Sequence, residues 1–555
     1  MSTLGVSPAR MLRPLRWSVV VGALLLLACG QPSAPASTSA PPATPVTPVV
    51  ASVTVSPATA VLAVGATVDL SAAGFDRNGT AVPGRTVSWN SATPAVATVS
   101  NAGRVTAVTA GTASIRATID GQSATASITV TTVPGGSDGF VTAVPPIDFN
   151  VIPARPTETS IALSLYSAST RTVTVTLLDE NRVVTQALTG GEPAVLELTG
   201  LAPERSYRYR ITGPSLSFTG AFRTARRTGS AFRFVMQADS HLDTNTDPAL
   251  YTNTLRNMVA DSADFLVDLG DTFMSDKYAD FRDAAAQYYA QRHYFGIVGT
   301  VMPTFLVQGN HDAENGWLGA NTTWAAQQRV RWFPPIIGNA FYSTAFLPRN
   351  YYAWRWGDAT FIALDPYTFT ATQPNRAGSS WAWTLGREQY DWLERTLRGT
   401  TTPFTFVFLH HLVGGRGFEA RGGVEASYAF EWGGANLDGT PGFTANRPGW
   451  TAPIHQLLVQ YQVSAVFHGH DHLYVNQQRD GIRYQEVPQP GFPRDNATAS
   501  AVDYGYLSGV LLGSFGHLRV SVASDRAVVE YVRSRLTTGN GAVVDRYEIL
   551  PARRP

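Results

Sequence analysis

The sequence predicts a multidomain protein with two all-β sandwiches followed by an α/β domain, in which two central sheets are flanked by helices. At 555 residues the chain is too long for one hydrophobic core, since single cores rarely grow beyond about 250–300 residues. Apolar and polar residues alternate from residue 51 to about residue 227, as in strands with one buried face. From about residue 230, short β-rich runs alternate with helical patterns, which is typical of βαβ units.

Composition and charge narrow the classes of function. The formal net charge is +1, which gives no electrostatic reason to expect nucleic acid as a partner. Lys277 is the only lysine among the basic residues, and we attribute the excess of arginine to a GC-rich genome rather than to phosphate binding. Cys29 is the only cysteine, so disulfides and thiol catalysis are excluded.

The first 29 residues have the features of an export signal. Three arginines among the first sixteen residues precede the apolar run 19–28, which is too short to span a bilayer. The run ends in LLACG and resembles a bacterial lipobox, although Leu27 is not the small residue usual at its position. The resemblance implies cleavage before Cys29 and lipidation of its thiol. We expect an exported lipoprotein of the cell envelope, at the outer membrane if the cell has one, or a secreted protein if Cys29 is incidental.

A tether and a first sandwich are predicted to follow. Residues 30–50 are rich in Pro, Ala, Ser and Thr and have too little apolar surface to fold. In residues 51–132, the runs SVTVSP, LAVGATVDL and VSWNSATPAVATVS resemble a bacterial Ig-like domain of group 2. The resemblance implies a spacer or attachment module without chemistry of its own, with a cell surface or a polysaccharide as its expected contact.

The second sandwich is expected at residues 146–227, after a joint rich in Pro and Gly. Its runs SIALSLYS and TVTVTLLD predict strands, and the turn LAPERSYRY is a local marker. The segment resembles a fibronectin type III-like domain, and purple acid phosphatase-like enzymes have a similar sandwich ahead of their catalytic domain.

Helices are predicted between the β-rich runs of residues 230–550. Asp247 and the proline after it predict the start of a helix, and Ser275 is expected to cap a helix over 278–293. A third helix is predicted to stop at Gly399, and a fourth precedes the run VSAVF.

Five apolar runs of this region end in side chains that bind metals. They are FRFVMQA before Asp239 and His241, FLVDL before Asp271, TFLVQ before Asn310, His311 and Asp312, TFVFL before His410 and His411, and VSAVF before His468, His470 and His472. Groups at the carboxyl ends of parallel strands converge on one crevice. Asp, Asn and His supply the oxygen and nitrogen atoms that a pair of cations needs. The pattern predicts a hydrolase with two metal ions.

In this order the motifs resemble those of calcineurin-like metallophosphoesterases, over roughly residues 230–550. The resemblance implies that Asp239, His241, Asp271 and His472 bind a first metal ion. It further implies that Asp271 bridges to a second ion, which Asn310, His410 and His470 also bind. The implied cofactors are two divalent or trivalent ions of Fe, Mn or Zn. A tyrosinate-bound ferric ion is not expected, because Met274 stands where purple acid phosphatases have their tyrosine.

A water that bridges two such ions is acidic enough to supply hydroxide near neutral pH, and this hydroxide is expected to attack phosphorus in line. His311 is expected to protonate the leaving oxygen. Asp312 is a candidate to orient His311, and Asp276 and Asp268 are alternatives that sequence does not separate.

Substrate-binding residues are expected after the fourth run. His411 follows His410 directly, and the glycine-rich segment 413–450 is long enough to be a functional loop. Its Arg416 and Arg421 are candidates for clamping a phosphate. A solvated surface loop explains the same composition.

Three functions are compatible with these features. The first is an exported hydrolase of small phosphomonoesters, and the second is a phosphodiesterase or nucleotidase with the same metal centre. The third is a cell-surface adhesion or scaffold protein with a vestigial phosphatase domain. No expected ligand is missing from the motifs, which argues against the third. The full ligand set behind an export signal makes the first our leading hypothesis, and the metal centre alone does not separate it from the second.

Overall fold

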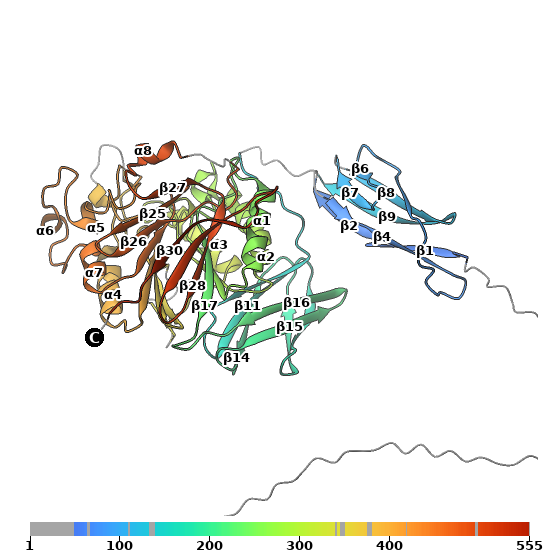
Figure 1. Ribbon diagram of the computed structural model, residues 1–555, viewed down its shortest axis with the longest axis horizontal. Helices are drawn as coiled ribbons and strands as arrows, with labels where there is room; N and C mark the ends of the chain where they lie inside the picture. The colour runs from blue at the N-terminus through green and yellow to red at the C-terminus, as the bar shows by residue number, and fades with distance from the viewer. Residues whose placement is uncertain are drawn as a thin grey trace, which may run out of the picture.

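The computed structural model describes residues 49–63, 67–108, 111–131, 139–338, 341–344, 350–374, 380–417, 419–493 and 498–553 (Figure 1). The predicted signal peptide, Cys29 and the predicted tether up to residue 48 lie outside the described residues. Within the described ranges, no helix combines the length and the apolar character needed to cross a membrane.

The first β-rich region consists of three small sheets. The four-stranded sheet has the order β2 (Thr59–Ala63), β9 (Gln122–Thr131), β8 (Gly111–Ile119) and β5 (Ser88–Ser91). The two-stranded sheet pairs β1 (Ser52–Ser56) with β4 (Ser71–Phe75). The three-stranded sheet has the order β3 (Thr67–Asp69), β7 (Arg104–Ala107) and β6 (Ala97–Val99). Alternate residues of β8, among them Ala113 and Ile115, are fully buried, as the alternating pattern predicts.

The second β-rich region has two antiparallel sheets that enclose one core. The first sheet has the order β10 (Phe149–Ala154), β11 (Ser160–Ser167) and β14 (Ala194–Thr199), and the second β13 (Arg182–Leu188), β12 (Arg171–Leu177), β15 (Ser206–Gly213) and β16 (Leu216–Arg223). At the LAPERSYRY turn, the Tyr207 hydroxyl accepts a hydrogen bond from the backbone N–H of Ala202 at 2.7 Å. This bond fixes the corner between the turn and β15.

Two larger sheets form the α/β region. The six-stranded sheet has the order β19 (Thr304–Leu306), β18 (Phe265–Asp268), β17 (Phe232–Gln237), β28 (Gly516–Val522), β29 (Ala527–Arg533) and β30 (Ala542–Ile549). The eight-stranded sheet has the order β20 (Tyr342–Ser343), β21 (Tyr352–Trp356), β22 (Ala359–Ala363), β23 (Phe404–Phe408), β24 (Ala465–His468), β26 (Ile482–Glu486), β25 (Leu473–Arg479) and β27 (Val510–Gly513). Strands β17 to β19 are parallel to one another, as are β22, β23, β24 and β26.

The two sheets pack face to face over an aromatic core. Phe234 of β17 packs edge-on against Phe361 of β22 at 5.2 Å between ring centroids, and Trp354 of β21 stacks on Phe305 of β19 at 4.2 Å. Because this core joins the sheets, strand ends from both meet along one edge of the sandwich. The predicted fold class, all-β regions followed by an α/β sandwich, is confirmed.

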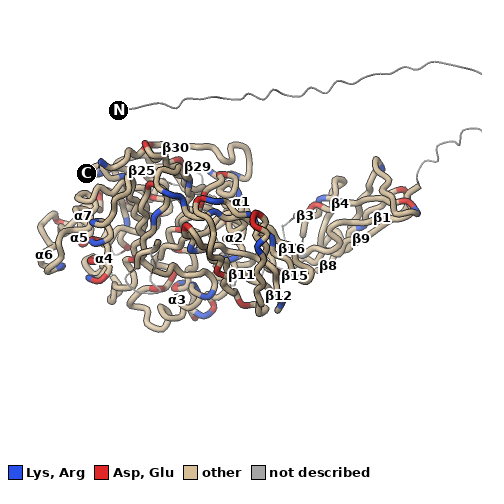
Figure 2. The backbone as a smooth tube through the Cα atoms, turned by 90° about the horizontal axis from the view of Figure 1, so that it is seen from below, with Lys and Arg blue, Asp and Glu red and all other residues tan. Residues whose placement is uncertain are grey.

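Helices cover the outer faces of the sandwich. Side chains of α1 (Pro248–Ala260), α2 (Ala285–Val298) and α3 (Ala320–Trp332) pack on the first sheet, and those of α4 (Gly386–Arg398) and α7 (Ile454–Gln460) pack on the second. Figure 1 shows α1 and α2 on one side of the sheets and α4 and α7 on the other. Short helices α5 (Phe430–Gly433), α6 (Phe443–Asn446) and α8 (Ser500–Tyr504) lie in the long loops. Basic and acidic residues are interspersed along the chain (Figure 2).

Two helix starts show where local signals succeed and fail. Asp247 caps α1 as predicted, because its carboxylate accepts hydrogen bonds from the N–H groups of Ala249 and Leu250. The helix expected from residue 278 begins instead at Ala285, after two 3-10 turns, η1 (Ser275–Lys277) and η2 (Phe281–Ala284). Met274, before η1, has a left-handed backbone with φ of 49°, and the hydroxyl of Ser275 bonds that of Tyr288 rather than capping a helix.

Candidate metal centre

Each predicted ligand lies just beyond the carboxyl end of a parallel strand. Asp239 follows β17, Asp271 follows β18 and Asn310 opens the 3-10 turn η3 (Asn310–Asp312) after β19. His410 follows β23, and His470 and His472 follow β24. Asp239, Asp271, His470 and His472 all have positive φ values, between 54° and 82°. Such backbone is uncommon for residues other than glycine, and strain of this kind is concentrated at functional sites.

Glycines beside the ligands allow neighbouring strand ends to approach each other. A Cβ on Gly469 would lie 2.5 Å from the Cβ of Ala238 and 2.8 Å from Oδ2 of Asp239. A Cβ on Gly309 would collide with the backbone N and the side chain of Asp271. The motifs GNHD and GHDH therefore need glycine because the loops of two strands pass each other without space for a side chain.

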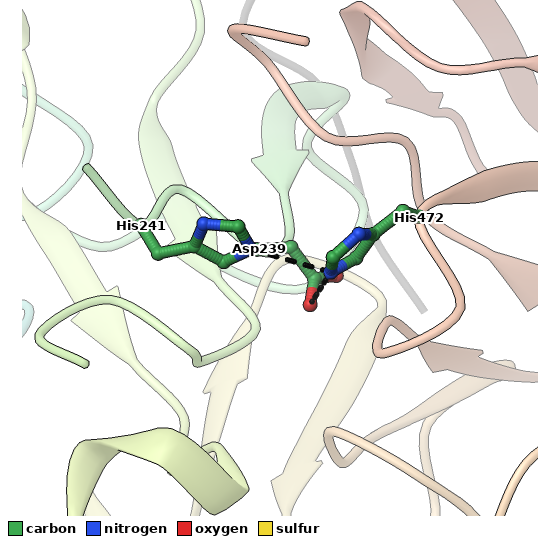
Figure 3. Close-up of side chains that lie close together, drawn as sticks. All are labelled: Asp239, His241 and His472. Atoms are coloured by element: carbon green, nitrogen blue, oxygen red, sulfur yellow. Dashed lines mark hydrogen bonds and ion pairs between the residues drawn. The ribbon is translucent and has the colours of Figure 1, made fainter. Parts of the chain in front are cut away.

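The first of two clusters consists of Asp239, His241 and His472, whose ligand atoms lie within 4.8 Å of one another. Nε2 of His472 lies 3.3 Å from Oδ1 of Asp239 and 3.2 Å from Nε2 of His241. Figure 3 shows the two rings on either side of the carboxylate. Two imidazole nitrogens and a carboxylate oxygen turned toward one point are the donor set of a transition-metal ion.

The second cluster consists of Asp271, His410 and His470, which are all buried. Nε2 of His410 lies 3.1 Å from Oδ2 of Asp271 and 3.7 Å from Oδ1 of Asp239. His410 thus stands between the carboxylates of the two clusters, which makes them neighbours. Asn310 adjoins the second cluster, since the backbone N–H of the next residue, His311, donates to Oδ1 of Asp271 at 2.7 Å.

The donor atoms fit a pair of cations. Oδ1 of Asp239, Oδ1 of Asn310 and Nε2 of His410 are buried and form no hydrogen bond of good geometry, a costly state for polar atoms. Among the described residues, the close polar neighbours of Oδ1 of Asp239 and Nε2 of His410 are ionisable side chains of other predicted ligands. Nδ1 of His410 donates to the carbonyl of Leu269, and Nε2 of His470 donates to the carbonyl of Glu419. These bonds leave Nε2 of His410 and Nδ1 of His470 as the lone-pair atoms, and carbonyl partners of this kind orient metal-binding histidines.

The charges of the centre couple cation binding to proton release. Burial disfavours a proton on His410, but Asp271 and Asp239 outweigh burial and raise its pKa to about 10. Burial likewise disfavours ionisation of Asp271, yet the charges of His410 and His311 hold the pKa of this carboxyl well below its usual range. A cation bound at Nε2 of His410 would replace its proton, so cation binding would strengthen as pH rises.

His311 lies beside Asp276 and not beside Asp312. Nδ1 of His311 is 3.0 Å from both carboxylate oxygens of Asp276. The Asp312 carboxylate accepts hydrogen bonds from four backbone N–H groups, those of Gly309, Asp271, Thr272 and Phe273. Asp268 bonds Thr272 and Gln237. We therefore correct the role of Asp312, which anchors the loops of Asp271 and Asn310 and does not orient His311.

The expected substrate-binding residues differ in their surroundings. His411 is buried, and its Nδ1 donates to the carbonyl of Leu412 while its Nε2 has no partner. Arg421 donates to Asp471 at 2.9 Å, to Glu419 at 2.8 Å and to the carbonyl of His470 at 3.2 Å. Its guanidinium braces the loop of His470, and its role as a phosphate clamp stays a prediction. Arg416 is exposed and pairs with Arg421 only through the backbone.

Comparison with known proteins agrees with this geometry. Residues 232–474 match the model of the calcineurin-like phosphoesterase family, and residues 49–130 match that of the bacterial Ig-like domain (group 2). The chain contains a calcineurin-like phosphoesterase domain. No curated protein sequence gives a significant match.

Solved structures that resemble this one have low sequence identity to it. A structure of PhoD is 14% identical with a TM-score of 0.52, and the match covers 75% of this chain and 90% of that one. The purple acid phosphatase PPD1 from yellow lupin (Lupinus luteus) seeds is 14% identical with a TM-score of 0.49, over 90% of this chain and 95% of that one. At this identity the PhoD match shows the fold alone.

Tyr367 is one residue of the phosphoesterase domain that sequence reasoning missed. It follows β22, which is parallel to β23, so it reaches the same sheet edge as His410. Its ring packs edge-on against that of His411 at 5.1 Å, and its buried hydroxyl has no hydrogen-bond partner. Burial, and then the charge of Asp271, raise the pKa of this hydroxyl well above its usual range, so it stays protonated. The sequence did contain a signal for Tyr367, because it follows a sixth strand of the domain, but a tyrosine after a strand is usually a packing residue.

Proposed function

We propose that this protein hydrolyses small phosphomonoesters at the centre formed by its two Asp and His clusters. The observation that best supports this proposal is that six buried or half-buried Asp and His side chains, from four strand ends, form two adjoining ligand sets. When bound, two cations would lower the pKa of a shared water and neutralise charge on the phosphate oxygens. Asp239, His241 and His472 would hold one ion, and Asn310, His410 and His470 the other. Asp271 would bridge the two.

His311 supports the proposal as the proton donor to the leaving oxygen. It lies beside the centre, since its backbone N–H bonds Asp271, and Asp276 holds its Nδ1. Nε2 is therefore the atom available to substrate. In the metal-free centre, burial opposes its charge, but Asp271 and Asp276 outweigh burial and raise the pKa of His311 above its usual value. A protonated imidazole near neutral pH is the state that a general acid requires.

The charge around the centre favours a monoester over a diester. A phosphomonoester is dianionic near neutral pH, and two exposed cations lie on segments that border the centre. Lys277 follows Asp276, and Arg416 pairs through the backbone with Arg421. A diester has one charge fewer and gains less from them. A phosphodiesterase with the same centre is the alternative outcome of the assay.

The test uses the full chain, stripped of metal with a chelator and reloaded separately with Mn, Fe or Zn. We expect the reloaded protein to hydrolyse p-nitrophenyl phosphate faster than bis-p-nitrophenyl phosphate. Asp271→Asn should lose at least about 10³-fold in kcat, because it removes the shared carboxylate. The matched control Asp525→Asn, at an exposed position, should keep full activity. Equal activity in Asp271→Asn, or no hydrolysis by any reloaded form, contradicts the proposal.

Export and surface attachment are part of the same proposal. The basic and apolar pattern of residues 1–29 supports export, and Cys29 is the expected site of a lipid anchor. The Ig-like region is proposed to contact a cell surface or polysaccharide. Fractionation of cells that express the wild type or Cys29→Ser tests the anchor, since the variant should leave the membrane fraction. A variant that stays membrane-bound contradicts it.

A further inference from the structure

Residues 139–147, between the two β-rich regions, run along the surface of the phosphoesterase domain. We call this segment the strap. Phe140 forms an isolated antiparallel bridge with Asp243, and the N–H of Val141 donates to the carbonyl of Leu242 at 2.8 Å. The strap's Val141 and Val144 pack on the core beneath α1 and α2, and the N–H of Ile147 donates to the Tyr289 hydroxyl at 2.8 Å. The strap is thus anchored along its length.

Phe140 also contacts a second loop of the domain. Its ring stacks on that of Tyr278 with 4.2 Å between centroids and 10° between planes. The hydroxyl of Tyr278 accepts a hydrogen bond from Gln287 of α2 at 3.1 Å, which fixes the far end of the ring. Phe140 therefore connects the loop after β17 with the turn before η2.

The two residues that Phe140 contacts, Asp243 and Tyr278, each lie two positions after a residue that belongs to the metal centre or contacts His311. Asp243, which pairs with Phe140, follows His241, and its Oδ2 is 3.4 Å from Nδ1 of His241. Tyr278, which stacks on Phe140, follows Asp276, the partner of His311. The side chain of Phe140 is half-buried between these two loops.

The turn that bears Asp276 has little internal support. Between the left-handed Met274 and α2 the backbone forms only the short turns η1 and η2. Within η1, the N–H of Lys277 bonds the carbonyl of Met274 at 3.1 Å. Segments with so few backbone bonds are held by side-chain packing, or else move. The stack on Phe140 is such a packing contact, and it comes from outside residues 232–474 that match the family.

We propose that Phe140 is a positioning residue of the active site, which holds the Asp276 turn against the His241 loop. The inference rests on the proposed function, because its effect is exerted through Asp276 on the proton donor His311. On this proposal, the strap contributes to catalysis by the phosphoesterase domain. A misplacement of about 1 Å in a catalytic group can cost on the order of 10²-fold in rate, so the loss of one brace should be measurable.

The experiment compares two substrates that depend differently on proton donation. p-Nitrophenyl phosphate has a good leaving group, whereas glycerol 2-phosphate releases an alkoxide that needs a proton. In the metal-loaded full chain, Phe140→Leu should lower kcat on glycerol 2-phosphate about tenfold, and on p-nitrophenyl phosphate by less than about threefold. Phe140→Tyr retains the stacked ring and should retain both rates. Phe218→Leu is the matched control, because it removes a half-buried ring that packs on Phe149 in the second β-rich region.

Hydrogen–deuterium exchange gives a readout that is independent of activity. Phe140→Leu should raise exchange in peptides that cover 240–247 and 273–280, while metal content and the exchange of other peptides stay unchanged. A wild type that hydrolyses neither substrate overturns the proposed function, and this inference with it. An active wild type overturns this inference alone if Phe140→Leu lowers both rates equally or not at all. Unchanged exchange at both loops has the same consequence.

Discussion

Asp276 holds Nδ1 of His311 at 3.0 Å from each of its carboxylate oxygens, in a turn that belongs to no regular helix. Asp276→Asn keeps a hydrogen-bond acceptor but removes one of the two negative charges, those of Asp271 and Asp276, that raise the pKa of His311. We expect kcat on alkyl phosphates to fall on the order of 10–10²-fold, since general acids contribute about 10²–10⁴-fold. The loss on p-nitrophenyl phosphate should be smaller.

Asp312→Asn provides the contrast. Its carboxylate accepts four backbone hydrogen bonds, so the substitution should lower thermal stability and affect both substrates alike. If Asp312→Asn showed the leaving-group dependence and Asp276→Asn did not, the assignment of the two aspartates would be reversed.

Arg421 is predicted to support metal binding through the loop of His470. Its guanidinium donates hydrogen bonds to the carbonyl of His470 and to the buried carboxylate of Asp471. The carbonyl of Glu419, two residues before Arg421, accepts a hydrogen bond from Nε2 of His470. Because such partners typically change metal affinity about 10–100-fold, Arg421→Lys should weaken binding of one of the two ions by roughly that factor. Competition with a chelator, followed by metal analysis, measures this effect.

Arg416→Lys is the control for Arg421, since it changes an exposed arginine of the same hairpin. It should leave the metal content at two ions and affect only KM. Full metal affinity in Arg421→Lys together with a raised KM would contradict this role and favour Arg421 as a phosphate clamp.

The residues brought together at the sheet edge could be predicted because strand periodicity and strand direction are local properties. Asp239, Asp271 and His410 each end an apolar run, and parallel strands carry their ends to the same edge. The partner of His311 was not predictable in this way. The choice between Asp276 and Asp312 depends on the left-handed Met274 and on a helix that starts later than its pattern suggests.

Contacts between residues far apart in the sequence likewise could not be predicted from the motifs. Arg421 meets Asp471 through a loop of glycines and turns that has no periodicity to interpret. Phe140 reaches Tyr278 from a segment that sequence composition describes only as a joint. In both cases the partner is determined by packing of the finished fold, and local propensity carries no information about it.

Tyr367→Phe is predicted to separate stability from activity. The buried hydroxyl of Tyr367 has no partner, and an unsatisfied buried polar group costs about 1–3 kcal/mol. Its removal should raise the melting temperature of the metal-free protein. We expect kcat to fall about tenfold at the same time, because a donor beside His411 is lost to the bound substrate. A variant with full activity would mean that the hydroxyl has no part in catalysis.

Asp268 is predicted to make the stability of the metal-free protein depend on pH. Its carboxyl is fully buried, and burial raises its pKa to about 6 against the hydrogen bonds from Thr272 and Gln237. In the unfolded chain an aspartate titrates near about 3.9. The folded state therefore favours the protonated form. The stabilisation is complete below about pH 3.9 and is lost as pH rises through about 6.

The difference of about two pKa units corresponds to ~3 kcal/mol of unfolding free energy. Asp268→Asn cannot ionise, and its amide can pair with Gln237, whose Oε1 has no partner, if the glutamine amide turns. Melting temperatures measured in chelator between pH 4 and pH 7 should fall less for this variant than for the wild type. The control Asp525→Asn should follow the wild type. Parallel curves for wild type and Asp268→Asn would show that Asp268 stays ionised in the folded protein, and that Gln237 and Thr272 stabilise its charge.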